Sequence, residues 1–229
     1  MPSILLALTS HADLGETGLR TGFYVPEAAH AHRVFTSAGY DVDFVSVLGG
    51  DPPRDGVEPG DHEATAFLRD HADELADTAA PGDLDAGDYA AIFYVGGHGA
   101  MWDFPDAGGL AALAAQIYEA DGVIGAVCHG QAALVNLVLN DGRYLVSGKL
   151  LTSFTNAEEA HVGMSGVVPF SLQDRLTERG AHFTGMTQFT DHAVADGRLV
   201  TGQNPASAAS TATQVVRVLA RVSRRPDRD

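Results

Sequence analysis

The stretch GAVCHGQAAL, residues 125–134, contains the only cysteine of the 229-residue chain, Cys128. It joins an apolar run, GVIGAVC at residues 122–128, that predicts a buried strand to residues 130–139, which predict a helix. A strand that turns into a helix around a nucleophile flanked by small residues is typical of a nucleophile elbow. There the nucleophile takes a strained backbone and its side chain stands clear of the sheet. The spacing therefore favours Cys128 as a nucleophile over a small buried core residue.

The surroundings of Cys128 predict a reactive sulfur. The dipole of the following helix would favour the thiolate over the thiol, so we expect this sulfur to be ionised. Adjacent backbone N–H groups would then hold an oxyanion. His129 follows directly, and the sequence leaves three roles open for it: a base, a main-chain donor, or a residue that fills space at a helix start.

Outward from this elbow, predicted strands and helices alternate along the chain. The expected strands are residues 3–8, 40–49, 89–97 and 122–128, followed by short ones at 150–154, 182–184 and 198–201. The expected helices are residues 26–38, 62–76, 109–120, 130–139, 168–179 and a final one up to 222, with Asn204 as N-cap and Pro205 first. This order predicts a mostly parallel sheet covered on both faces. We expect one domain at 1–222 and a tail at 223–229.

Composition limits the partners and the compartment. The chain has 14 Lys and Arg against 30 Asp and Glu, a formal charge of -16, which disfavours nucleic acid and anionic membranes as partners. A single cysteine forms no internal disulfide. The apolar start lacks a preceding basic region and predicts a strand, not a signal peptide, and no apolar stretch is long enough to cross a bilayer. We expect a cytoplasmic protein.

A second segment, YVGGHGAMWDFPD at residues 94–106, also ends a predicted strand. Its glycines let the backbone approach a ligand closely, although a tight turn alone would explain them. Trp102 is a candidate pocket wall, a role that is compatible with simple packing. The segment lacks the pattern of a phosphate-binding loop.

Two further features are less specific. Glu27 begins a predicted helix, where a carboxylate usually faces water. Ten histidines raise the question of a metal site, because Glu27, His30 and His32 are close in sequence. His32 does not share the helix face of the other two, so a metal site is the least favoured alternative. We expect no metal and no cofactor.

Four segments together resemble the ThiJ/PfpI superfamily. They are GGHGAMWDFPD, AVCHGQAALVN, LTSFTNAEE and DGRLVTGQNPASA, and with the early TGFYVPEAAHAHRVFTSAGYDVDFVSVLGG they are most similar to its glutathione-independent glyoxalase III branch, which is related to heat-shock chaperones. The resemblance covers most of the chain. It implies a flavodoxin-like three-layer α/β sandwich related to class I glutamine amidotransferase domains.

The resemblance also implies roles for individual residues. Cys128 would be the nucleophile, with His129 beside it in the active site. Glu27 would reach the sulfur and share a proton with it, against the solvent-facing orientation that periodicity alone predicts. A third acidic residue, Glu159 by position with Glu158 second, would orient the histidine.

The substrate would bind beside the glycine-rich turn. Oxyanion donors are expected near Gly97 and His129, and His98 and Trp102 would contact the substrate. Gln131 stands where the branch commonly has proline, which adds an amide that we expect near the thiolate and that could alter substrate preference. Glutamine hydrolysis is set aside, because the late His-x-Glu pair of amidotransferases is missing.

The function implied is a cofactor-free lyase of the D-lactate dehydratase type. It would convert a small carbonyl substrate, a 2-oxoaldehyde such as methylglyoxal, with water to a 2-hydroxy acid, and we expect a homodimer. Two alternatives remain open. One is a stress-protective chaperone of the same superfamily, and the other is a different cysteine-dependent hydrolase, hydratase or lyase on the same scaffold.

Overall fold

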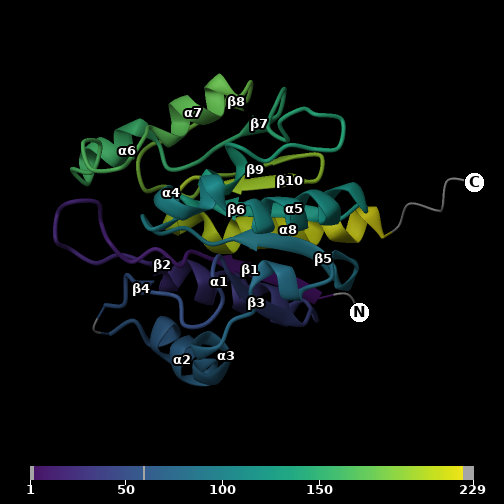
Figure 1. Cartoon of the computed structure of the whole chain (residues 1–229), viewed down its shortest axis with the longest axis horizontal. Helices are drawn as coiled ribbons and strands as arrows, with labels where there is room; N and C mark the ends of the chain where they lie inside the picture. The colour runs from purple at the N-terminus through teal and green to yellow at the C-terminus, as the bar shows by residue number, and fades with distance from the viewer. Residues whose placement is uncertain (1–2, 59, 224–229) are drawn as a thin grey trace, which may run out of the picture.

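The computed structural model describes residues 3–58 and 60–223 and is built around one six-stranded sheet (Figure 1). In spatial order its strands are β3 (Val42–Ser46), β1 (Ser3–Leu8), β5 (Tyr89–Tyr94), β6 (Val123–Val127), β10 (Leu199–Gly202) and β9 (Ala193–Asp196). All pairings are parallel except that of β9 with β10. The predicted α/β class with a mostly parallel sheet is confirmed. Among the described residues, no helix is long and apolar enough to cross a membrane.

Helices cover both faces of the sheet. Helices α1 (Val25–Ser37) and α8 (Ala208–Val222) pack together on one face, where their apolar side chains join those of the strands in one core cluster. Helix α5 (Gly108–Glu119) covers the other face and contributes to a second cluster. Strands buried on both faces explain the nearly continuous apolar runs of β1, β5 and β6 in the sequence.

Smaller elements surround this core. They are α2 (His62–Asp70), α3 (Ala72–Ala76), α4 (Ala100–Asp103), α6 (Asn156–His161), α7 (Leu172–Glu178), the 3₁₀-helices η1 (Pro81–Asp83), η2 (Ala86–Asp88), η3 (Phe104–Asp106), η4 (Gly130–Leu134) and η5 (Pro205–Ser207), and the strand pairs β2 (Phe23–Tyr24) with β4 (Arg54–Asp55) and β7 (Leu150–Leu151) with β8 (His182–Phe183). In Figure 1, α6, α7, β7 and β8 gather at one end of the molecule, opposite α2 and α3.

The helix predicted after the elbow is wrong in type and length. Residues 130–139 form only the short 3₁₀-helix η4, which ends at Leu134. The guanidinium group of Arg179, the residue after α7, donates to the backbone carbonyl of Val135 at 2.8 Å and to the side-chain amide oxygen of Asn136 at 2.8 Å. The Val135 carbonyl thus binds a distant side chain where a longer helix would offer it to a backbone N–H. The cysteine is therefore followed by a weaker dipole than the sequence suggested.

Other boundaries also differ from the prediction. Asn204 and Pro205 begin the helical segment as predicted, but its first three residues form the 3₁₀-helix η5, and α8 begins only at Ala208. The Asn204 side chain makes no capping hydrogen bond; its amide donates to Glu158 at 2.8 Å and to the carbonyl of Thr190 at 2.9 Å. The predicted helix 62–76 breaks into α2 and α3 at His71, and the one predicted at 168–179 is only α7. Strand β9 and helix α6 were not predicted. Of the predicted tail, residues 224–229 lie outside the described residues.

The topology brings the two singled-out segments together. Strands β5 and β6 are paired with Tyr94 opposite Ala126, so the turns that follow them lie side by side at the carboxyl edge of the sheet. The first turn of α1 reaches the same edge, because the N–H of Tyr24 donates to the carbonyl of Gly96 at 2.9 Å. Ligands of open parallel sheets bind at this edge.

Candidate active site

Cys128 occupies the strained turn that the sequence predicts. Its φ is 60°, a left-handed conformation that is uncommon for a residue with a Cβ atom. Both of its backbone groups are fixed: the N–H donates to the carbonyl of Gly202 at 2.9 Å, and its carbonyl accepts from the N–H of Phe154 at 3.0 Å. The structure thus places Cys128 in an elbow whose backbone is held from two sides.

Glu27 faces this cysteine and not the solvent. Its carboxyl group is fully buried, and its Oε2 accepts a hydrogen bond of 2.8 Å from the N–H of Gly96. A Cβ atom on Gly96 would lie 2.5 Å from Glu27 Oε2 and 2.7 Å from the Cβ of Cys128, so only glycine fits between them. The solvent-facing orientation that periodicity predicts for Glu27 is wrong, and the position implied by the resemblance is the observed one.

The carboxyl and thiol groups form a coupled pair. The other oxygen, Glu27 Oε1, has no well-formed hydrogen bond, yet the group lies close enough to Cys128 for the pair to exchange one. Burial raises the pKa of Glu27 to about 8, against the lowering effect of its hydrogen bonds with Cys128 and Gly96. At neutral pH this carboxyl group is therefore mostly protonated.

Burial opposes the ionised resting sulfur that the sequence predicts. The Cys128 side chain is buried, and burial raises its pKa well above the ordinary value, as do the charge and hydrogen bond of Glu27. Hydrogen bonds from the backbone N–H groups of His129 and Gly97 act in the opposite direction but do not outweigh burial. Burial thus favours the thiol form, and two amide donors are already directed at its sulfur. These are the groups that the sequence analysis names as oxyanion donors.

His129 connects the sulfur to Glu159. Its Nδ1 lies 3.3 Å from Cys128 Sγ, and its Nε2 lies 2.9 Å from Glu159 Oε2. The other carboxylate oxygen, Glu159 Oε1, lies 3.0 Å from Nε2 of His98. Of the two acidic residues weighed for this position, the first choice, Glu159, is the one that contacts the histidine.

Burial and hydrogen bonding give these groups opposite pKa shifts. Burial lowers the pKa of His129 to about 4, helped by the neighbouring His98, although Glu159 opposes the shift. Burial alone would raise the pKa of Glu159, but hydrogen bonds from His129 and His98 outweigh it and lower the pKa to about 2. Glu159 is therefore a carboxylate at neutral pH, held between two imidazole rings.

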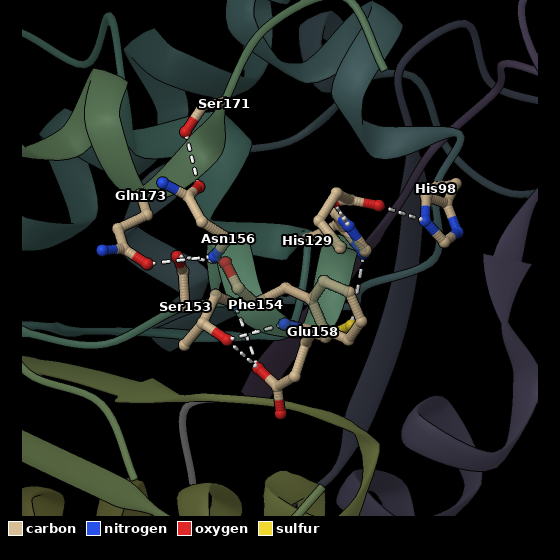
Figure 2. A network of polar contacts seen from close by, with 11 residues as sticks. His98, His129, Ser153, Phe154, Asn156, Glu158, Ser171 and Gln173 are labelled. Atoms are coloured by element: carbon tan, nitrogen blue, oxygen red, sulfur yellow. Dashed lines mark hydrogen bonds and ion pairs between the residues drawn. The ribbon is translucent and has the colours of Figure 1, made fainter. Parts of the chain in front are cut away.

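Helix α6 positions Glu159 through its neighbour. Thr155 and Glu158 form a reciprocal capping box at the start of this helix. Glu158 also accepts hydrogen bonds from Gln203 at 3.0 Å and from Asn204 at 2.8 Å. Figure 2 shows Glu158 close to His129 and His98. Glu158 thereby anchors the helix that points Glu159 at the histidines.

Phe154 closes the site on one side. Its ring lies 4.4 Å from that of His129, centroid to centroid (Figure 2). Phe154, Thr155 and Glu159 also line a cavity of about 240 Å³ that reaches Ser165 and Ser171. An apolar ring over the imidazole keeps His129 out of water, which agrees with its lowered pKa.

Two predicted substrate contacts have other partners in the structure. Gln131 is fully buried, and its NH₂ group donates to the carbonyls of Gly202 at 2.7 Å, Thr152 at 3.0 Å and Ala126 at 3.3 Å. Its amide therefore ties the ends of neighbouring segments together within the core. Trp102 is half-buried and stacks on His11 with ring centroids 5.2 Å apart. Contact of either residue with substrate stays a prediction.

The metal alternative of the sequence analysis does not assemble. Glu27 faces Cys128, His30 lies 3.6 Å from Glu63, and the ring of His32 packs on Phe44. Elsewhere in the part of the chain that the structure describes, ligand atoms of His98, His129 and Glu159 come within 4.8 Å of one another. Both oxygens of that carboxylate are already hydrogen-bonded to the imidazoles, which satisfies the three groups without an ion.

Glu159 was predicted through the resemblance, but helix α6, which positions it, was not predicted. The segment TNAEE, which begins at Thr155, carries the Thr-x-x-Glu pattern of a capping box, so the helix was detectable. Phe154 and Gly96 carried no local signal for their roles. Those roles arise from contacts with His129 and with Glu27, which the fold alone brings close.

The comparisons with known proteins agree with this fold. At the level of families, residues 20–218 match the DJ-1/PfpI family. The glutathione-independent glyoxalase HSP31 of Saccharomyces cerevisiae is 36% identical, over 94% of this chain and 97% of its own length. The crystal structure of glyoxalase III from Candida albicans has a TM-score of 0.88 at 32% identity, covering 94% of this chain and 96% of that one. The Rapid Encystment Protein of Francisella tularensis has a TM-score of 0.92 at 35% identity, covering 96% and 99%.

Proposed function

The chain belongs to the DJ-1/PfpI family, and we propose that within it the chain is a glutathione-independent glyoxalase. The observation that carries the proposal is the contact chain from Glu27 through Cys128 and His129 to Glu159 at a strained elbow. Relatives with this activity in their names match nearly the whole chain. The substrate is a small 2-oxoaldehyde such as methylglyoxal, and the product is a 2-hydroxy acid.

The first step forms a covalent bond between enzyme and substrate. The minor carboxylate form of Glu27 takes the proton of the Cys128 thiol, because the pair is close and both pKa values are raised by burial. The sulfur attacks the aldehyde carbon, and the electron pair of the C=O bond moves to its oxygen. The N–H groups of Gly97 and His129 lie beside the sulfur and stabilise this oxyanion. Its protonation gives a hemithioacetal.

The second step moves a hydrogen between neighbouring carbons. His129 takes the proton from the former aldehyde carbon, which gives an enediol, and a proton returns to the adjacent carbon. His129 is suited to this role because its Nδ1 faces the sulfur at 3.3 Å while the Glu159 carboxylate stabilises the imidazolium through Nε2. The product of the step is a thioester of Cys128.

The third step releases the product. Water attacks the thioester, the carbon–sulfur bond breaks, and the thiol is restored with one proton. The 2-hydroxy acid ionises at neutral pH, so each turnover converts one aldehyde and one water into a carboxylate and a proton. The former aldehyde carbon is oxidised and the neighbouring carbonyl carbon is reduced, so no external oxidant or reductant is consumed.

The test is a glutathione-free assay with several 2-oxoaldehydes on the parent and on Cys128→Ala. The parent should form 2-hydroxy acids, and the variant should lose all covalent turnover. His182→Ala, a change at an exposed residue of β8, is the matched control and should behave as the parent. A Cys128→Ala protein that turned over methylglyoxal at the parent rate would contradict the proposal.

Several finer statements remain predictions. They are the D-lactate dehydratase type of lyase, a homodimer, a cytoplasmic location, and the absence of nucleic acid and membrane partners. A chaperone activity and another cysteine-dependent hydrolase or hydratase reaction also stay open as alternatives. A panel of small carbonyl and nitrile substrates distinguishes the second alternative from a glyoxalase, because nitrile turnover leaves no 2-hydroxy acid.

A further inference from the structure

The turn GGHG, residues 96–99, presents a single side chain to the site. A Cβ on Gly97 would lie 2.2 Å from the carbonyl oxygen of Gly22, and one on Gly99 would lie 2.6 Å from that of His11. Gly96 is equally confined between Glu27 and Cys128. Three of the four positions therefore exclude side chains, and His98 alone reaches out of this turn toward Glu159.

His98 ends a line of contacts that begins at the sulfur. The line runs from Cys128 Sγ to His129 at 3.3 Å, from His129 to Glu159 at 2.9 Å, and from Glu159 to Nε2 of His98 at 3.0 Å. The two imidazole rings are 4.2 Å apart, centroid to centroid. Figure 2 shows His98 at the outer end of this network.

Exposure changes along the same line. The side chain of His129 is 1% exposed and that of Glu159 is 9%, whereas that of His98 is 22% exposed. His98 is thus the member of this line with a face open to water. An imidazole that touches a buried carboxylate on one side and solvent on the other is built to accept a proton at one nitrogen and release one at the other.

The proposed reaction moves protons within a buried site. Each turnover produces one proton with the carboxylate product, and Cys128, His129 and Glu27 are all buried. We propose, on the basis of the proposed function, that His98 is the proton-relay residue of the site, which carries protons between the His129–Glu159 pair and bulk water. It exchanges protons without forming bonds to the substrate carbon.

Two variants separate a relay from a structural role. His98→Gln keeps an amide N–H that can donate to Glu159 but cannot carry a proton, and His98→Ala removes both properties and opens space for added imidazole. At low buffer concentration both should lower kcat by about 10-fold or more with little change in KM, since relay failure slows proton transfer and not binding. His182→Gln is the control for loss of an exposed histidine.

Rescue by free imidazole distinguishes a proton relay at His98 from a structural role. The kcat of His98→Ala should rise with imidazole concentration toward that of the parent, while kcat of the parent and of His182→Gln should not respond. A loss of kcat that imidazole does not restore, with His98→Gln near the parent value, would reduce His98 to a structural partner of Glu159. Unchanged kcat in both variants would also overturn the relay. A parent that turned over no 2-oxoaldehyde would instead remove the proposed function, and the relay with it.

Discussion

Two glutamates flank the same cysteine and histidine, and the fold gives them different charge states. Glu27 is fully buried and accepts one backbone hydrogen bond, and burial raises its pKa to about 8. Glu159 is also buried, yet an imidazole at each carboxylate oxygen lowers its pKa to about 2. Burial acts on both carboxyl groups in the same direction. The difference shows that the number and type of donors, more than depth, determine which carboxyl group stays charged.

These two charge states suit the proposed chemistry. A mostly neutral Glu27 gives the buried thiol a partner with which one proton can be shared, without placing a permanent second charge beside it. A Glu159 that is a carboxylate in the resting protein supports a positive charge on His129 when the imidazole takes a proton. The largest expected effects therefore come from changes that reverse one of these two states.

Of the two glutamates, replacement of the charged one, Glu159, should have the larger effect on turnover. Glu159→Gln leaves the shape but removes the negative charge that stabilises the His129 imidazolium, so kcat should fall by about 10²–10⁴-fold with little change in KM. The measurement is steady-state turnover of methylglyoxal without glutathione.

The neighbouring glutamate provides the matched control. Glu158 accepts from Thr155, Gln203 and Asn204 and has no contact with His129 in the hydrogen-bond network. Glu158→Gln should lower the melting temperature more than Glu159→Gln does, with a smaller effect on kcat. Equal losses of kcat in the two variants would mean that Glu159 acts only as part of helix α6.

Replacement of the mostly neutral Glu27 should lower turnover less, and it should change the pH dependence of turnover. In the parent, kcat/KM should rise with pH through about 8, the pKa of Glu27, because the carboxylate form takes the thiol proton. Glu27→Gln cannot take it, so kcat should fall by about 10²-fold and this limb of the profile should disappear. Glu16→Gln, at an exposed glutamate, should keep the parent profile. A Glu27→Gln protein that retained the limb would assign it to another group.

The sheet and the elbow that hold these glutamates could be predicted from local sequence patterns. The alternation of apolar runs and helices sufficed for the sheet and for the elbow, because the strands that end at Tyr94 and Val127 are continuous apolar segments. The charge state of Cys128 was not accessible in this way. It depends on burial and on Glu27, a residue about a hundred positions upstream that meets the sulfur only in the folded chain.

Long-range side-chain contacts explain the remaining differences. Beyond the elbow Arg179 binds the carbonyl of Val135, and the side-chain amide of Asn204 donates to Glu158. Each contact joins positions more than 40 residues apart, beyond the reach of any periodicity. The resemblance supplied the orientation of Glu27, since helix periodicity favours the opposite one.

The pH dependence of folding stability should also differ between Glu27 and Glu159, and these are the smallest expected effects. The pKa of Glu27 rises from 4.5 to about 8 on folding, so its stabilising contribution is full below pH 4.5 and is lost as the pH rises to about 8. That of Glu159 falls from 4.5 to about 2, so its contribution is present above pH 4.5 and is lost as the pH falls through about 2.

Thermal melts across pH measure both contributions. Between about pH 5 and pH 9 the parent should lose a few degrees of melting temperature that Glu27→Gln does not lose, and in acid Glu159→Gln should lose less than the parent. If the parent and Glu27→Gln melted in parallel across this range, the raised pKa of Glu27 would be wrong.

The most direct measurement of the central claim is a ¹³C NMR titration of the glutamate carboxyl carbons in the resting protein. Glu27→Gln and Glu159→Gln identify the two signals by their loss. We predict that the Glu27 signal titrates at about 8 and that the Glu159 signal stays ionised down to about 2. Two signals that both titrated at the ordinary glutamate value of about 4.3 would show that the fold does not distinguish these groups.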